Sequence, residues 1–262
     1  MPRRTMPATD NSYHLATLRR ALKPFRLYFY TRIRSTNEHA AKLRRSGKLY
    51  APAILVAARQ LAGRGRGSNV WWSGPGSITV TFVIPIDAGI LPHQVPIIAG
   101  LGVLRGVHKL CNNTDSRLKW PNDLLHDDLK LAGLLCERVE GADLIGLGLN
   151  VNLDLDEVPS SLRHRVTTVA AVAGRQISVQ KALTTIAAEL AGLLLSKDFG
   201  SFAQVLKEYN RSHALKDRRV RISEPGGKVV QGICEGLDQE GRLLVRTPAG
   251  LQRLVAGNVE LL

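Results

Sequence analysis

The sequence is short of cysteine, of aromatic residues and of long apolar runs. Its three cysteines, Cys111, Cys136 and Cys234, are odd in number and lack metal-ligand spacing, so neither a disulfide framework nor a zinc site is expected. No apolar stretch is long enough to span a bilayer, and none follows Arg3 and Arg4 as it would in a secretory signal. With 5% aromatic residues, aliphatic side chains should fill the core. These absences favour a soluble cytoplasmic protein with reduced thiols and no membrane partner.

Several familiar catalytic motifs are also missing. The chain has no GxSxG, no HExxH, no phosphate loop of the GxxxxGK[ST] type and no GxGxxG that opens a helix. The polar groups that are concentrated in motifs are cations and amides instead of a nucleophile with its base. This pattern favours phosphoryl or nucleotidyl transfer by positioning and charge stabilisation, which needs no covalent catalysis by the protein.

Positive charge, by contrast, is abundant. Lysine and arginine number 36 against 22 acidic residues, which gives a formal net charge of +14. Such a balance suits nucleic-acid binding, and it equally suits an enzyme that handles ATP and an acidic protein partner. The 44% hydrophobic fraction and 22% charged fraction are those of an ordinary globular protein.

Hydrophobic periodicity predicts three parts: an N-terminal arm with a short helix over 1–24, a larger α+β domain over 25–213 and a small C-terminal domain over 214–262. Four or five short strands after residue 217, separated by glycine-containing turns, predict a small antiparallel barrel at the C-terminus. In the larger domain, we expect helices over 35–46, 92–111, 179–195 and 202–212, and strands over 25–33, 53–58, 77–86, 117–120, 129–139 and 144–152.

A glycine-arginine loop, Gly63-Arg64-Gly65-Arg66-Gly67, is the first candidate site. Its glycines let the backbone approach a ligand, and its arginines neutralise carboxylate and phosphate oxygens. Trp71 or Trp72 offers an apolar wall close by. A flexible loop that contacts RNA is the alternative for this composition.

The second candidate is Lys119-Trp120-Pro121-Asn122-Asp123, with Lys130 after a polar turn at Asp127-Asp128. The lysine ends a strand and can project into a cleft, while proline forces a turn that presents Asn122 and Asp123 side by side. An ordinary hairpin connection with exposed lysines explains the composition equally well.

Two further segments carry amides. Ser35-Thr36-Asn37 starts a helix and could grip a ureido group, although a helix cap alone accounts for Ser35. The segment 146–152 ends a strand with glycines and two asparagines, where glycine indicates either close backbone approach by a ligand or a bulge.

Taken together and in this order, these segments resemble the biotin protein ligases. The matching stretches are Ser35-Thr36-Asn37, Gln60 through Gly67 with Trp71, Lys119 through Asp123, Lys130-Leu131-Ala132-Gly133, and Gly148 to Asn150. The C-terminal strands are similar to the SH3-like domain that ends many of these ligases. The resemblance implies a mixed sheet with flanking helices, akin to the catalytic fold of class II aminoacyl-tRNA synthetases.

The resemblance also implies an activity with two steps. Biotin and ATP form biotinyl-5′-AMP, and a lysine of a biotin carboxyl carrier protein then takes the biotin and releases AMP. Magnesium is expected to enter with ATP, and which carboxylate contacts it is open. Catalytic roles fall to Lys119 and Arg64. The implied biotin-binding residues are Ser35, Thr36, Asn37, Gln60, Arg64, Gly65, Arg66, Lys119 and Gly133, and the implied ATP-binding residues are Arg66, Trp71, Asn122, Asp123, Lys130 and Asn150.

The chain departs from the family pattern in the loop. Many members carry a second arginine-glycine pair there, where this chain has Gly67-Ser68-Asn69-Val70. Some members are also repressors with an N-terminal helix-turn-helix domain. Only about 24 residues precede the first expected strand, which is shorter than that module, so a monofunctional ligase without DNA binding is expected. Whether the chain forms a homodimer is open.

Two alternatives remain. A lipoate protein ligase shares the fold and the adenylation chemistry, and competition between biotin and lipoate for adenylate formation separates the two. A basic nucleic-acid-binding module predicts steeply salt-dependent affinity that survives replacement of Lys119 by alanine.

Overall fold

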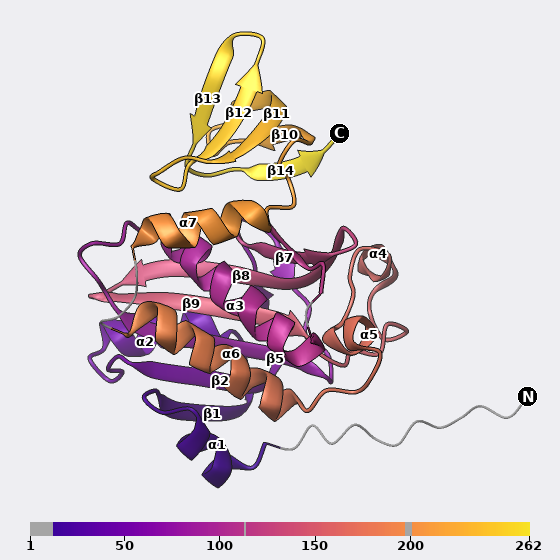
Figure 1. Cartoon of the computed structure of the whole chain (residues 1–262). Helices are drawn as coiled ribbons and strands as arrows, with labels where there is room; N and C mark the ends of the chain where they lie inside the picture. The colour runs from indigo at the N-terminus through magenta and orange to yellow at the C-terminus, as the bar shows by residue number, and fades with distance from the viewer. Residues whose placement is uncertain (1–12, 113, 197–200) are drawn as a thin grey trace, which may run out of the picture.

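A mixed seven-stranded sheet is the centre of the molecule (Figure 1). The computed structural model describes residues 13–112, 114–196 and 201–262, so the expected arm over 1–12 lies outside the described residues. The strand order is β1-β2-β5-β9-β8-β7-β6, in which β1 and β2 are parallel and all other neighbours antiparallel. Its strands are β1 (Arg26–Ile33), β2 (Ala53–Gln60), β5 (Ser77–Pro85), β6 (Arg117–Lys119), β7 (Asp123–His126), β8 (Leu129–Val139) and β9 (Ala142–Asn150).

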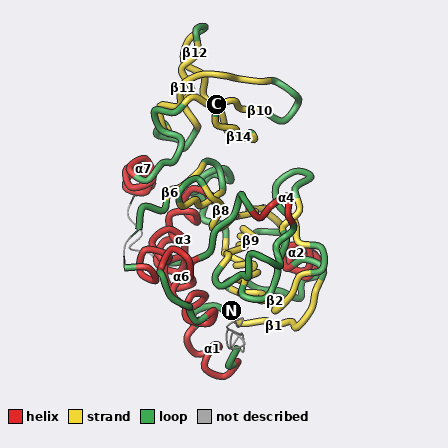
Figure 2. The backbone as a smooth tube through the Cα atoms, turned by 90° about the vertical axis from the view of Figure 1, so that its right-hand side faces the viewer, coloured by secondary structure: helices red, strands yellow, loops and turns green. Residues whose placement is uncertain are grey.

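Helices cover the two faces of this sheet unequally. Figure 2 shows α3 and α6 on one side and α2 on the other. On the α3 side, Ile54, Phe82 and Leu147 join the main core, whereas Leu55, Val83 and Leu144 pack under α2. The helices are α1 (Leu15–Ala21), α2 (Thr36–Arg45), α3 (Val95–Cys111), α4 (Ser160–Arg163), α5 (Val169–Ala173), α6 (Val179–Leu194) and α7 (Phe202–Arg211).

Successive side chains of strand β9 point to opposite faces of the sheet, and this alternation determines which face carries the site. Ile145, Leu147 and Leu149 are buried in the main core. The residues between them point to the opposite face because successive side chains of a strand alternate. There Leu144 packs under α2, while Gly146 and Gly148 leave space beyond the end of that helix.

A second, five-stranded antiparallel sheet ends the chain, and we call it the C-terminal sheet. Its order is β13-β12-β11-β10-β14, and its strands are β10 (Arg219–Ser223), β11 (Val229–Leu237), β12 (Leu243–Thr247), β13 (Gly250–Leu254) and β14 (Asn258–Leu261). It lies next to α7, where the Asn210 side chain exchanges two hydrogen bonds with the backbone of Leu237.

The two sheets are also joined by backbone pairing at β6. Leu118 N–H donates to Ser212 O at 2.8 Å, and Ala214 N–H donates to Leu118 O at 2.9 Å. The segment that leads from α7 into the C-terminal sheet therefore extends the large sheet beyond β6.

The structure corrects the expected element list in four places. Strand β7 was missed, because Pro121 and the polar residues after it indicated only a turn. The glycine-arginine loop is a hairpin formed by β3 (Gly63–Arg64) and β4 (Val70–Trp71). Helices α4 and α5 are too short to show a periodic pattern. Strand β14 lies outside the expected strand ranges.

No helix within the described residues is long and apolar enough to cross a membrane.

Candidate active site

A cavity of about 620 Å³ opens on the α2 side of the sheet. Every residue that the sequence predicted for biotin or ATP lines this one cavity, although the two sets come from six separate segments. They are Ser35, Thr36, Asn37, Gln60, Arg64, Gly65, Arg66, Trp71, Lys119, Asn122, Asp123, Lys130, Gly133 and Asn150.

Uncharged side chains form one end of the cavity, which we call the amide end. The Ser35 hydroxyl caps α2 by accepting from the Glu38 N–H at 3.4 Å, as its position in the sequence predicted. Gln60 Oε1 accepts from the Thr36 N–H at 2.7 Å and from the Thr36 hydroxyl at 3.1 Å. The first turn of α2 is thus bound to the end of β2.

Asn37 is the most constrained residue of the amide end. The Thr81 hydroxyl donates to its Oδ1 at 2.6 Å, and its Nδ2 donates to Leu135 O at 3.0 Å and to Glu137 Oε2 at 2.9 Å. A Cβ at Gly146 would lie 2.4 Å from Asn37 Oδ1, so only glycine leaves room for this amide. The glycine that was expected to admit a ligand therefore admits a side chain of the site.

Arg64 and Arg66 leave the hairpin in different directions. Arg64 Nη1 lies 3.9 Å from Glu137 Oε1, a long and half-exposed pair that contributes little to stability. Arg66 Nη1 instead donates to Gly257 O of the C-terminal sheet at 3.1 Å. Burial lowers the pKa of Arg66, and Asp123 acts in the opposite direction.

Trp71 ends the hairpin against strand β9. A Cβ at Gly148 would lie 2.1 Å from the Trp71 indole, so this glycine also makes room for a site residue. Lys130 Nζ lies 5.7 Å from the centre of a Trp71 ring, within the range of a cation–π contact.

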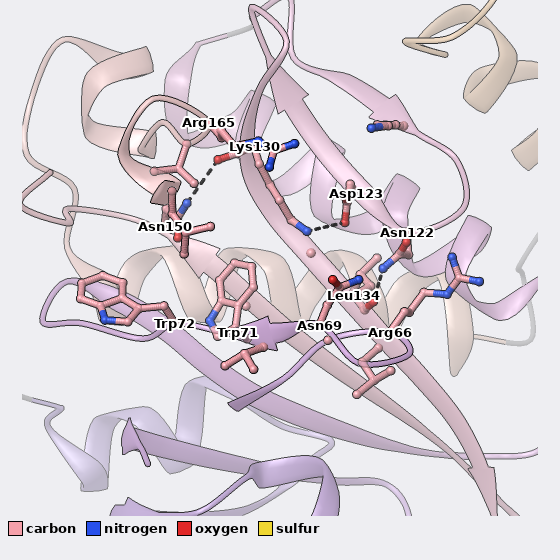
Figure 3. Close-up of a pocket in the computed structure, with 18 of the residues that line it drawn as sticks. Arg66, Asn69, Trp71, Trp72, Asn122, Asp123, Lys130, Leu134, Asn150 and Arg165 are labelled. Atoms are coloured by element: carbon pink, nitrogen blue, oxygen red, sulfur yellow. Dashed lines mark hydrogen bonds and ion pairs between the residues drawn. The ribbon is translucent and has the colours of Figure 1, made fainter. Parts of the chain in front are cut away.

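The opposite end of the cavity is cationic, and we call it the cation end (Figure 3). Lys130 Nζ contacts Asp123 Oδ1 at 2.8 Å, and a Cβ at Gly133 would crowd both groups. Asp123 is the first residue of β7 and faces Lys119 across the β6–β7 ladder. The sequence predicted that Asn122 and Asp123 both lie in the turn, but the turn ends at Asn122.

Lys119 lies at the end of β6, beside Asp123 at the cation end of the cavity. Burial lowers the pKa of its ammonium, Asp123 raises it, and the neighbouring cations Lys130 and Arg165 lower it again. An ammonium that is partly desolvated in this way gains most from a nearby anion, because charges interact more strongly away from water.

The two asparagines of the cation end hold the backbone that surrounds the cavity. Asn122 Nδ2 donates to Leu134 O at 2.6 Å. Asn150 Nδ2 donates to Lys130 O and to Thr167 O, each at 3.2 Å, and so joins β8 to the segment before α5.

Sequence reasoning missed several residues in or beside the cavity. Glu137 contacts Asn37 and Arg64 and follows the matched motif on the same face of β8, so strand alternation could have found it. Arg165 lies in a polar connection without periodicity, and Gly257 is more than a hundred positions from the motifs. Asn69 also lines the cavity, as do Asp128, Leu153, Val158, Leu162 and the residues 258–261 of β14.

The site therefore has donors and acceptors for an uncharged polar group at one end and cations for an anion at the other. Among the described residues, no group of three or more histidine, cysteine or carboxylate side chains is placed to hold a metal ion.

Two family models match the chain. The biotin/lipoate A/B protein ligase family covers residues 29–154, and the biotin protein ligase C-terminal domain covers residues 217–262. The biotin--[acetyl-CoA-carboxylase] ligase of Paracoccus denitrificans is 30% identical over 238 residues, which are 86% of this chain and 96% of that protein. The chain belongs to the biotin protein ligases.

Other family members agree in fold and differ in length. The biotin protein ligase of Aquifex aeolicus, solved in complex with biotin and ATP, superposes with a TM-score of 0.77 and is 26% identical, covering 90% of this chain and 98% of that one. The bifunctional ligase/repressor BirA of Bacillus subtilis is 28% identical over 220 residues, which are 79% of this chain. The match spans 66% of that longer relative.

Proposed function

We propose that this family member activates biotin with ATP and attaches it to a lysine of a biotin carboxyl carrier protein. One observation carries the proposal: a single cavity is lined by the amide end and by the cation end, which includes Lys119. Biotin has a ureido group that suits amides and a carboxylate that must meet a phosphate. The cavity offers matching groups in that order.

In the first step, a carboxylate oxygen of biotin attacks the α-phosphorus of ATP. The bond from that phosphorus to the bridging oxygen breaks, and pyrophosphate leaves with the electron pair. Both reactants are anions, so a cation between them lowers the repulsion and stabilises the charge that develops on the phosphate. We assign this role to Lys119, with Arg64 and Arg66 as further cations that line the cavity.

In the second step, the neutral amine of a carrier lysine attacks the acyl carbon of biotinyl-5′-AMP. An amide bond forms, the acyl–oxygen bond breaks, AMP leaves with the electron pair and the amine loses a proton. Lys119 then stabilises the departing phosphate oxygen. No covalent intermediate with the protein is needed.

The proposed roles of the other residues follow their positions. Thr36, Asn37 and Gln60 face the ring system of biotin, and Trp71, Asn150 and the apolar side chains of segment 153–166 face the base. Arg165 adds a cation on the nucleotide side, where magnesium would enter with ATP. The likeness to the class II synthetase fold, the SH3-like barrel, the three-part domain division and a cytoplasmic location are further parts of this proposal.

The test is incubation of the protein with biotin, MgATP and an acceptor carrier domain, followed by intact mass measurement of the carrier. The expected result is a carrier heavier by one biotinyl group, formed only when ATP is present. Pyrophosphate release that depends on lipoate and not on biotin would contradict the proposal. Salt-sensitive nucleic-acid binding that survives Lys119→Ala, without any biotin transfer, would favour the binding-module alternative.

A further inference from the structure

The carboxamide of Asn37 is held in one orientation at the amide end of the cavity. Its Nδ2 donates to Leu135 O at 3.0 Å and to Glu137 Oε2 at 2.9 Å. A backbone carbonyl and an ionised carboxylate only accept hydrogen bonds, so the nitrogen of the amide must face them, and not the oxygen. Both hydrogens of this nitrogen are then engaged by the protein.

The oxygen of the same amide lies on the cavity side. The Thr81 hydroxyl, which is fully buried, donates to Asn37 Oδ1 at 2.6 Å. A Cβ at Gly146 would lie 2.4 Å from this oxygen, and Gly146 and Asn37 both line the cavity. A carbonyl oxygen can accept two hydrogen bonds. The Asn37 side chain in this orientation can therefore offer a ligand an acceptor, whereas its donors are already used.

Glu137 supplies the charged partner of this amide. It lies on β8 two residues after Leu135, so the two side chains share the face of the sheet that carries the site. Its Oε2 accepts from Asn37 at hydrogen-bond distance, while its Oε1 is 3.9 Å from Arg64 Nη1, too far for a hydrogen bond. A hydrogen bond to a charged acceptor is among the stronger kinds, and a long, half-exposed ion pair contributes little. The main contact of Glu137 is thus with Asn37.

An acceptor at this position suits a ring that carries N–H groups. The cyclic urea of biotin has two N–H groups, whereas the dithiolane ring of lipoate has no hydrogen-bond donor. Only the first ring can form a hydrogen bond with the Asn37 oxygen. The orientation of one amide therefore bears on which of the two acids the cavity accepts.

We infer that Glu137 is a positioning residue for the choice of acid. It holds the Asn37 amide with the oxygen toward the cavity and so favours a ring acid with N–H groups over one without them. The choice of acid rests on the proposed function, whereas the orientation of the amide does not.

Side-chain amide NMR of the full-length protein, with isotope-labelled asparagine, tests the orientation. The Asn37 signal is assigned by its absence in Asn37→Ala, and its two hydrogens should exchange slowly with water in the wild type. Glu137→Ala removes one acceptor and should speed this exchange by about tenfold. Glu137→Gln is the matched variant because its carbonyl oxygen can still accept from Asn37, and exchange should stay within about threefold of the wild type.

Calorimetric binding constants test the choice of acid. The ligands are biotin and two analogues, in each of which one ring N–H is replaced by a methylene group. The wild type should bind biotin about tenfold more tightly than at least one analogue, and Glu137→Ala should reduce that preference by about fivefold. Glu137→Gln should keep the preference within about twofold. A merely structural role of Glu137 would weaken all three ligands equally and leave the preference unchanged.

Three results would overturn the inference. The first is equal exchange of the Asn37 hydrogens in the wild type and in folded Glu137→Ala. The second is a wild type that binds biotin and both analogues equally. The third is a Glu137→Gln protein that loses the preference as fully as Glu137→Ala, because the charge beside Arg64 would then be responsible.

Two further controls keep the outcomes separate. If Glu137→Ala does not fold, Glu137→Val replaces it, since valine suits a strand and likewise lacks an acceptor. If the wild type binds none of the three ligands, the proposed function fails, while the exchange measurement still decides whether Glu137 holds the amide.

Discussion

At the amide end of the cavity, Thr36 and Gln60 bind each other and Asn37 is held by Thr81, Leu135 and Glu137. At the cation end, Lys119 and Arg165 have no hydrogen bond or ion pair of their side chains among the described residues, although both line the cavity. The side chains of the amide end are held in place by protein partners, and Lys119 and Arg165 carry charge that can pair with an anionic ligand.

This difference separates two ways of building a binding site. A preformed network of neutral hydrogen bonds fixes geometry, costs little to maintain and depends weakly on salt. Unpaired cations attract an anion over a longer range, and screening by salt weakens that attraction. We therefore expect the amide end to control which acid is accepted and the cation end to control how strongly the nucleotide binds.

The largest expected effect is at Lys119 of the cation end. Lys119→Ala removes the cation that both proposed steps share, so each half-reaction should slow by about 10²- to 10³-fold. Rapid-quench measurement of adenylate formation, and of transfer from synthetic biotinyl-AMP, checks the two steps separately. Lys181→Ala, an exposed lysine of α6 outside the cavity, is the control. A loss confined to one half-reaction would show that Lys119 acts only in that step.

The next prediction concerns His213, which is buried next to Leu118 of β6 and whose ring is tilted against that of Tyr209. Burial, aided by Lys216, lowers the pKa of His213 to about 3 in the folded protein. The unfolded chain has a pKa near 6.5 and so binds a proton first as pH falls. Stability from this group is complete above about pH 6.5 and falls by about 1.4 kcal/mol per pH unit toward pH 3.

Urea unfolding between pH 7.5 and pH 4.5 measures this loss. His213→Phe should flatten the slope below pH 6.5 relative to the wild type, whatever the carboxylates of the site contribute to both proteins. If stability depends on pH equally in the two proteins, the acid sensitivity comes from groups other than His213.

Gly146→Ala tests the amide end alone. The new Cβ meets the Asn37 carboxamide at 2.4 Å and must displace it, which should cost about 1–3 kcal/mol of stability and raise the KM for biotin about tenfold. The KM for ATP should change less than about twofold, since the proposed nucleotide site is at the other end. Gly192→Ala on α6 is the matched control, because its Cβ would meet nothing within 4 Å. Equal changes in both constants would break the division into two ends.

The smallest expected effect is at the rim of the cation end. Arg165→Ala should raise the KM for ATP by about five- to tenfold with little change for biotin, because a partly solvated cation contributes modestly. The difference from the wild type should shrink at high salt. Arg163→Ala, two residues away and outside the cavity, is the control. A change that is insensitive to salt would point to packing instead of charge.

Local pattern predicted much of this arrangement. The Ser35 cap follows from the spacing of Ser35 and Glu38, and the strands that carry Lys119, Lys130 and Asn150 follow from runs of apolar residues. Motif resemblance brought together residues that do share one cavity. Which residues bind the ligand itself stays a prediction.

Other features depend on contacts between distant segments, and local pattern carries no trace of them. The sequence indicated either a close approach by a ligand or a bulge at Gly146 and Gly148. In the structure, the side chains of Asn37 and Trp71 occupy the space beside these glycines. Strand β7 is only four residues long and exists because β8 offers it a partner. The contact of Arg66 with Gly257 joins residues 191 positions apart.

The backbone pairing of Leu118 with Ser212 and Ala214 has a consequence for protein engineering. The connection to the C-terminal sheet serves as an extra edge beside the strand that ends in Lys119, so the two parts of the chain are not freely interchangeable units. A chimera joined before residue 212 would take this edge from the donor protein and leave β6 with a foreign neighbour. Joining the two parents after Leu215 keeps the native edge, and with it the register of Lys119.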